Sequence, residues 1–203
     1  RVRARLDNWG QEAVLEIAAK QELIGDQRSW RLMHLGDTGR AEFVWFTNGT
    51  AASGISAQST VPLPTWPGQR LALRVTLDVN NGSGGHTVTF YTADTIAGPW
   101  AQLGAPVTGA GTTSIYNSTS PLDVGNVQGM ALGVPVGRYY AMQLRNGIGG
   151  TIVADVDFTA RTVGDTSFAD SAGRTWSVMG DAQITNRQTR FHGEISEWPV
   201  RWG

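Results

Sequence analysis

The stretch that decides the fold is Arg70-Leu71-Ala72-Leu73-Arg74-Val75-Thr76-Leu77-Asp78-Val79. Leucine or valine stands at every second position, and polar or small residues stand between them. A period of two is that of a β-strand with one face in a core and the other in water. The sequence therefore predicts a half-buried antiparallel strand here.

The residues that follow this strand are expected to turn the chain back on itself. The run Asn80-Asn81-Gly82-Ser83-Gly84-Gly85 is rich in residues that tolerate a positive φ, which a tight loop needs. Residues 87–92 are rich in threonine and aromatic residues and are typical of a returning strand. We predict a β-hairpin over residues 70–92.

Alternation of the same kind recurs along the chain. Residues 139–145 and 150–158 are expected to pair around a glycine-rich turn. The composition of residues 11–22 favours helix, but their alternation favours a strand, which is the interpretation we prefer. Short strands separated by Gly, Asn and Asp turns about every 8–12 residues predict an all-β fold, an antiparallel two-sheet β-sandwich or jelly roll. Further alternating segments are Val2/Ala4/Leu6, Trp30/Leu32/His34 and Phe43/Trp45.

The residue pattern changes after Phe158, where a Gly-Asp-Thr-Ser turn leads into a new strand-like stretch. We predict a sandwich over residues 1–162. Residues 163–203 are predicted to be a linker and the first strands of a following β domain, or strands that close the sandwich. Because residue 1 opens directly on a strand pattern, we expect the chain to lie inside a longer polypeptide.

The composition and the net charge argue against several kinds of site and partner. Cysteine is absent, so the chain can form no disulfide and offers no thiol nucleophile. A formal net charge of −1 argues against nucleic acid as a partner, and no run approaches the roughly 18 apolar residues of a membrane span. Arg1, Arg3 and Arg5 alternate on one strand face, which we interpret as a solvated face.

Several stretches together resemble the laminin-G-like branch of the concanavalin superfamily, as found in tail proteins of actinobacterial phages and prophages. The likeness covers about residues 1–160. It implies a concanavalin/laminin-G-like jelly roll. The stretches are Asp26-Gln27-Arg28-Ser29-Trp30-Arg31-Leu32, Phe43-Val44-Trp45-Phe46-Thr47-Asn48-Gly49-Thr50, Leu73–Asp78, Phe90–Asp94 and Gly98–Gly104.

The end of the chain, residues 191–202, is similar to a junction of phage minor tail proteins in which a sandwich leads into a tail-hub-like β domain. The resemblance implies a non-catalytic module of a virion tail, whose partners are other tail or baseplate subunits and a host-surface polysaccharide. The alternative is a carbohydrate-binding domain of a secreted bacterial enzyme or adhesin.

Catalytic patterns are absent from the sequence. Retaining hydrolases with concanavalin-like folds resemble one another in carrying Glu-x-Asp-x-Glu or Glu-x-Asp-x-x-Glu on one strand, and neither pattern occurs here. The nearest carboxylate pairs are Asp155 with Asp157 and Glu194 with Glu197. No histidine lies near a Gly-x-Ser-x-Gly motif, and we expect no enzyme. The histidines are His34, expected in the core, His86, at the start of a strand, and His192.

Calcium is the one cofactor that the sequence suggests. Lectin-like sandwiches hold it with Asp and Asn oxygens at a loop, and Asp78, Asn80 and Asn81 are the candidates. The favoured interpretation is that these side chains satisfy local backbone groups in a turn. We also interpret the three Asn-x-Ser/Thr triplets, at Asn48, Asn81 and Asn117, as turns.

A carbohydrate site usually needs an exposed aromatic ring that stacks on a sugar. Trp66 stands between Pro64 and Pro67 in a loop and is the first candidate, followed by Tyr116 and Trp100. Simple anchoring of the loop is the alternative role for Trp66. The tryptophans within strand patterns are expected in the core: Trp30, Trp45 and Trp176.

Overall fold

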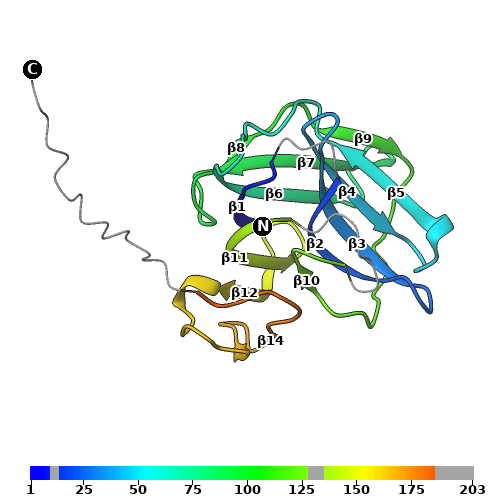
Figure 1. Cartoon of the computed structure of the whole chain (residues 1–203). Coiled ribbons are helices and arrows are strands. Elements are labelled where there is room, and N and C mark those ends of the chain that lie inside the picture. Colours follow the sequence, from blue (N-terminus) through cyan, green and yellow to red (C-terminus); the bar gives the residue numbers. More distant parts are fainter. Residues whose placement is uncertain (10–13, 128–134, 186–203) are drawn as a thin grey trace, which may run out of the picture.

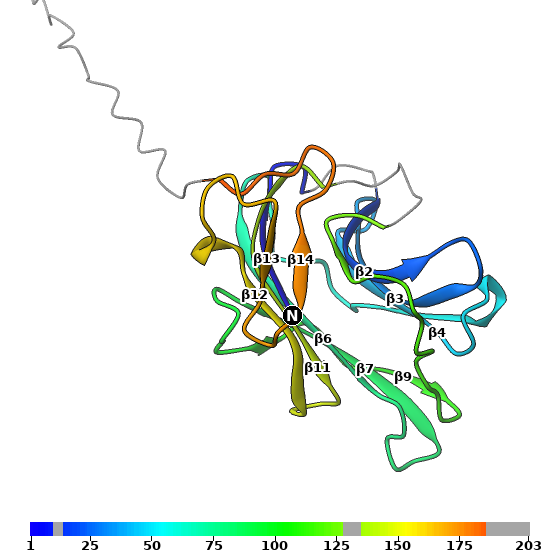
Figure 2. The same ribbon diagram turned by 90° about the horizontal axis from the view of Figure 1, so that it is seen from below.

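The computed structural model describes residues 1–9, 14–127 and 135–185. Over these residues the chain is all-β, with two antiparallel sheets that face each other and a small third sheet beside them (Figures 1 and 2). The prediction of an all-β fold with antiparallel sheets is confirmed. In the described part of the chain no helix is long and apolar enough to cross a membrane.

The larger sheet, sheet A, has seven strands in the order β12-β11-β1-β6-β7-β8, and β9 also pairs with β7. The first strand of the chain therefore lies in the middle of the sheet, between β6 and β11. Their bounds are β1 Val2–Leu6, β6 Arg70–Asp78, β7 Gly85–Ala93, β8 Ala101–Gln102, β9 Val107–Ala110, β11 Gly137–Asn146 and β12 Thr151–Asp157.

The smaller sheet, sheet B, has five strands in the order β10-β2-β3-β4-β5. Two short 3₁₀ turns, η1 (Ala51–Ser53) and η2 (Phe158–Ala160), lie in connections. The strand bounds are β2 Val14–Glu22, β3 Gln27–Leu35, β4 Arg40–Phe46, β5 Gly54–Gln58 and β10 Asp123–Val124.

Both predicted hairpins are present. β6 pairs with β7 from Ala72 opposite Ala93 to Asp78 opposite Thr87, and β11 pairs with β12. The described part of the 11–22 stretch is strand β2, as we preferred. Its pairing with β3 shifts between Glu16 and Ala18, so consecutive residues there are buried and strict alternation is lost.

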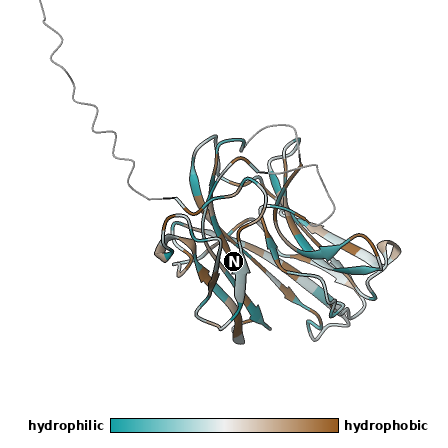
Figure 3. Cartoon of the chain, turned by 60° about the horizontal axis from the view of Figure 1, so that its bottom comes forward, coloured by the Kyte–Doolittle hydropathy of each residue, from teal (hydrophilic) through white to brown (hydrophobic). Residues whose placement is uncertain are grey.

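The core lies between the two sheets, and the strands that enclose it alternate hydrophobic and hydrophilic segments (Figure 3). Trp45 on β4 and Phe90 on β7 are fully buried, as expected for inward-facing positions of opposite sheets. Phe43 stacks on Trp45 with ring centroids 5.8 Å apart and is 6.2 Å from Trp30. The prediction that Trp30 and Trp45 are core residues is confirmed, whereas Trp176 is half-buried at the edge of the core.

The third sheet is a hairpin of β13 (Ser167–Ala169) and β14 (Thr175–Ser177). Its turn bonds to the outer edge of β12: Ser171 N–H donates to the Asp155 carbonyl, and the Asp170 carboxylate accepts from the Asp155 N–H at 2.9 Å. Hence part of the segment predicted to begin a second unit contacts the sandwich. Residues 186–203 lie outside the described part, and the boundary at residue 162 stays a prediction.

Candidate functional site

The position of β1 in sheet A brings distant arginines together. Arg5 on β1 lies opposite Arg70 on β6 and, on its other side, opposite Arg138 on β11. With Arg3 and Tyr140 these residues line an open concavity of about 560 Å³, which we call the arginine pocket. Four guanidinium groups thus converge on one place, although the sequence separates them widely.

The pocket lies on the outer face of sheet A because of the strand period. Val2, Ala4 and Leu6 of β1 are buried in the core, so Arg3 and Arg5 point to the opposite face. Arg70 and Arg138 are exposed at the start of their strands.

The arginines of the pocket are held in place by neighbouring groups. Arg3 and Arg70 stack on the ring of Tyr140, with their guanidinium carbons 5.4 and 4.5 Å from its centroid. Arg5 Nε donates to the Gly68 carbonyl at 2.7 Å. Arg5 also forms an ion pair, with its Nη2 atom 3.4 Å from Asp7 Oδ1. Both side chains are about half exposed (42% and 53%), so solvent screens this pair and it contributes little to stability.

A second group of arginines and aromatic rings continues the same face. Arg74 on β6 lies 3.7 Å from the ring centroid of Tyr91 and 5.1 Å from that of Trp100. Arg1 lies 5.5 Å from the ring of Trp100. The outer face of sheet A is therefore a surface of guanidinium groups stacked on aromatic rings.

Two of the three predicted sugar-contacting residues lie near this face. Trp66 is 64% exposed, in the loop whose Gly68 carbonyl binds Arg5. Trp100 is half-buried and covered by arginines. Tyr116 lies elsewhere, with its N–H bonded to the Phe46 carbonyl of sheet B. The three residues do not form one site, and their contact with a sugar stays a prediction.

The oxygens of the predicted calcium loop are engaged with the backbone of the loop itself. Asp78 Oδ1 accepts from the Asn80 N–H at 3.2 Å, and Asn81 Oδ1 accepts from the N–H groups of Ser83 and Gly85. These bonds are what the turn interpretation predicts. No group of three or more His, Asp or Glu residues that could hold a metal ion occurs in the described residues, and calcium at this loop stays a prediction.

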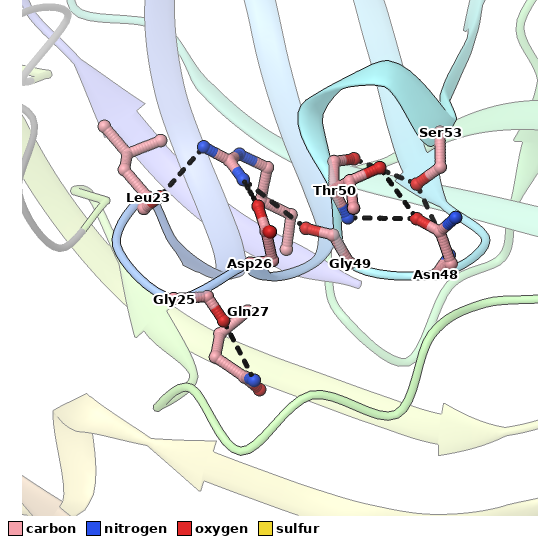
Figure 4. Close-up of polar contacts among 9 residues, drawn as sticks. Leu23, Gly25, Asp26, Gln27, Asn48, Gly49, Thr50 and Ser53 are labelled. Carbon is pink, nitrogen blue, oxygen red and sulfur yellow. Dashed lines mark hydrogen bonds and ion pairs between the residues drawn. The ribbon is translucent and has the colours of Figure 1, made fainter.

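Asn48 shows how such triplets serve as turns. Its Oδ1 accepts from both the N–H and the hydroxyl of Thr50, and the Ser53 hydroxyl donates to the Thr50 carbonyl (Figure 4). Arg28 joins this loop to the neighbouring one, since it bonds to the carbonyls of Gly49 and Leu23 and to Asp26. The polar groups at this end of sheet B thus bind one another and hold the loops together.

The candidate catalytic groups take structural positions. His34 is 1% exposed and packs edge-on against Trp9, and burial lowers its pKa against a weaker opposing effect of Asp37. His86 is buried beside Trp45, on strand β7 as expected. The carboxylates of β12 bind nearby donors: Asp155 accepts from Gln143 and Ser171, and Asp157 from Thr159. His192, Glu194 and Glu197 lie outside the described residues.

The arginine pocket is the functional candidate that sequence reasoning missed. The alternation of Arg3 and Arg5 was a usable signal, but it predicts only a solvated face until the neighbours of β1 are known. Comparison with models of protein families, with curated proteins and with solved structures finds no match for this chain.

Proposed function

We propose that this chain is a non-catalytic, surface-binding module of a phage or prophage tail protein, and that its arginine pocket binds an acidic polysaccharide on the host surface. The observation that carries the binding proposal is the convergence of Arg3, Arg5, Arg70 and Arg138 on one open concavity. The tail setting and the concanavalin/laminin-G-like jelly roll rest on the sequence resemblance.

Guanidinium groups favour anionic ligands over neutral sugars. A planar guanidinium can bind a carboxylate or a phosphate through two parallel hydrogen bonds, which a neutral hydroxyl cannot match. The Tyr140 ring lies against Arg3 and Arg70 and is only 7% exposed, so it offers no open face for sugar stacking. The pocket therefore suits repeated acidic groups along a chain.

The same geometry favours an acidic polysaccharide over a single-stranded nucleic acid. Binding of single strands relies on aromatic rings that stack with successive bases. In this face the rings of Tyr140, Tyr91 and Trp100 are all stacked with arginines. Trp66 is the exposed ring beside the pocket, and we propose that it packs on a sugar unit next to an acidic one.

A polysaccharide array tests the proposal with the full chain. Wild type is expected to retain polymers that carry uronic acid or phosphate groups and to release them as salt is raised. The variant Arg70→Gln with Arg138→Gln is expected to lose about tenfold in affinity, the change that about 1.4 kcal/mol produces. Arg40→Gln, which removes one positive charge on sheet B, is the control for each single substitution and should bind as wild type.

Three results would overturn the proposal. One is retention of neutral polymers alone, and a second is equal binding by wild type and the double variant. The third is a stronger, arginine-dependent affinity for single-stranded DNA. Trp66→Ala separates the two parts of the site, because it should weaken binding while the dependence on salt remains.

A further inference from the structure

The dipeptide Asn-Gly occurs three times in the chain, beginning at Asn48, Asn81 and Asn146. Glycine has no Cβ, so its main-chain nitrogen can approach the side chain of the preceding asparagine closely and attack the amide carbon. This attack begins the deamidation of asparagine. All three sites carry the same local chemistry, and a difference between them in the folded protein must come from their hydrogen bonds and packing.

The fold restrains the first site, at Asn48. Its Oδ1 accepts from the Thr50 N–H at 3.0 Å and from the Thr50 hydroxyl at 2.8 Å (Figure 4). Gly49, which carries the attacking nitrogen, is buried, and its carbonyl accepts from the Arg28 N–H at 3.2 Å. A Cβ at position 49 would overlap the main-chain oxygen of Asp26, which shows how closely this peptide is packed. Both partners of the reaction are therefore fixed.

The second site, at Asn81, is restrained by hydrogen bonds to every group involved. Asn81 Oδ1 accepts from the Ser83 N–H at 2.9 Å, and Nδ2 donates to the Thr87 hydroxyl at 3.1 Å. The N–H of Gly82, the attacking group, donates to Oδ1 of Asn80 at 3.4 Å. These bonds must break before the nitrogen of Gly82 can reach the side chain of Asn81.

The third site, at Asn146, lacks these restraints. Asn146 is the last residue of β11 and pairs with Thr151 of β12, so Gly147 is the first residue of the hairpin loop, and both are exposed. Within the part of the chain that the structure describes, neither the Asn146 side chain nor the Gly147 N–H forms a hydrogen bond. The cause is local, because Ile148 offers no hydroxyl where the first site has Thr50.

We propose that Asn146 is a site of spontaneous deamidation in the folded protein and that Asn48 and Asn81 are protected. The nitrogen of Gly147 forms a bond to Cγ of Asn146, the bond from Cγ to Nδ2 breaks, and Nδ2 leaves as ammonia with the proton that the attacking nitrogen gives up. Water then opens the cyclic succinimide. Opening at one carbonyl yields aspartate, and opening at the other yields isoaspartate, in which the main chain runs through the former side chain.

The product changes the charge and the backbone of the β11–β12 hairpin. A carboxylate replaces a neutral amide, so the formal net charge falls from −1 to −2. The new charge lies next to Arg145, which spans the loop by donating from Nη1 to the Gly150 carbonyl at 3.0 Å. Isoaspartate adds a methylene to the main chain where Asn146 pairs with Thr151, which weakens this last pair of the ladder. The site lies at the opposite end of β11 from Arg138 and does not rest on the proposed function.

Incubation of the full chain in mildly alkaline buffer made with heavy-oxygen water tests the proposal, with proteolytic peptides followed by mass spectrometry. The peptide that contains Asn146 should incorporate the label and gain the mass that replacement of NH₂ by OH produces. Enzymatic methylation should detect isoaspartate in the same peptide. The peptides that contain Asn48 and Asn81 should convert at least about tenfold more slowly, because at least two hydrogen bonds oppose the attack at each site.

The unfolded chain is the matched control. In concentrated guanidinium chloride the three sites should convert at similar rates, because glycine follows each asparagine and no fold restrains them. The proposal is wrong if Asn146 converts no faster than Asn48 and Asn81 in the folded chain. It is also wrong if the same ratio of rates persists in the unfolded chain. Asn146→Gln should remove the early acidic species seen by ion exchange, and a species that persists in this variant would exclude Asn146 as its source.

Discussion

Replacing Asp170 by asparagine tests how the β13–β14 hairpin is joined to the sandwich. The side chain is 7% exposed and accepts four hydrogen bonds. Oδ1 accepts from the N–H groups of Ala172 and Arg174, both at the turn of the hairpin. Oδ2 accepts from the Asp155 N–H at 2.9 Å and from the Trp176 indole N–H at 3.0 Å.

An asparagine in this place can keep Oδ1 as an acceptor, but its NH₂ group would face two donors where Oδ2 now stands. Each lost bond to a charged acceptor costs about 1.5 kcal/mol at the low end of measured values, so Asp170→Asn should cost about 3 kcal/mol. For a chain of this size that corresponds to a fall in Tm of roughly 6–12 °C. If the hairpin detaches by itself, the same loss appears as faster hydrogen exchange at the Asp155 N–H.

The pH dependence supplies an independent check. Burial alone would raise the pKa of Asp170, but the bonds from Trp176, Arg174, Asp155 and Ala172 outweigh it and lower the pKa below its ordinary value of 3.8. A lowered pKa means that the stabilisation is complete above 3.8 and is lost as pH falls through the folded-state pKa. The difference between wild type and Asp170→Asn should therefore shrink below pH 3.8.

Thermal unfolding followed by tryptophan fluorescence, together with native-state hydrogen exchange, measures both effects. Asp181→Asn is the control, because Asp181 is exposed in the loop after β14. Asp170 does not anchor the hairpin if Asp170→Asn leaves both Tm and the exchange of the Asp155 N–H unchanged. The same holds if the two aspartate variants behave alike.

Two further predictions concern Glu16 and Gly109. Burial raises the pKa of Glu16, the charge of Arg31 opposes this effect, and the charge of Glu42 adds to it. The stabilising contribution of Glu16 is therefore complete below pH 4.5 and is lost as pH rises through the raised pKa. In urea unfolding, the stability of wild type relative to Glu16→Gln should fall from pH 4.5 upward, and a constant difference would contradict this prediction. Gly109→Ala would place a Cβ in steric conflict with the imidazole ring of the buried His86 and should cost about 1–3 kcal/mol. The cost should be smaller in a His86→Ala background, and an equal cost in both backgrounds would rule out the clash.

The parts of the fold that could be predicted from the sequence are those encoded by neighbouring residues. The β6–β7 hairpin follows from the alternation after Arg70 and from the glycine-rich loop, both of which are local. Strand β2 is harder to assign because its composition favours helix although its alternation favours a strand. Its pairing with β3 and β10 in sheet B overrides that local preference.

The arginine pocket could not be predicted because it depends on strand order. Alternation shows that Arg3 and Arg5 share a face, but not that β1 lies between β6 and β11. Only that order brings Arg70 and Arg138 to either side of Arg5. The role of Asp170 was hidden for the same reason, since its turn is ordinary and its partner Asp155 lies on another strand.

The placement of charged residues in the fold matters more for binding than the net charge of the chain. A net charge of −1 argues against a polyanionic partner only if the charges are spread evenly over the surface. A sheet sorts alternate residues onto one face, and here that sorting gathers the arginines of three adjacent strands while acidic Glu16 and Glu42 lie on strands of the other sheet. Near-zero net charge is therefore compatible with a strongly cationic site. What argues against nucleic acid is the stacking of arginines on the aromatic rings of that face, a feature that only the folded chain has.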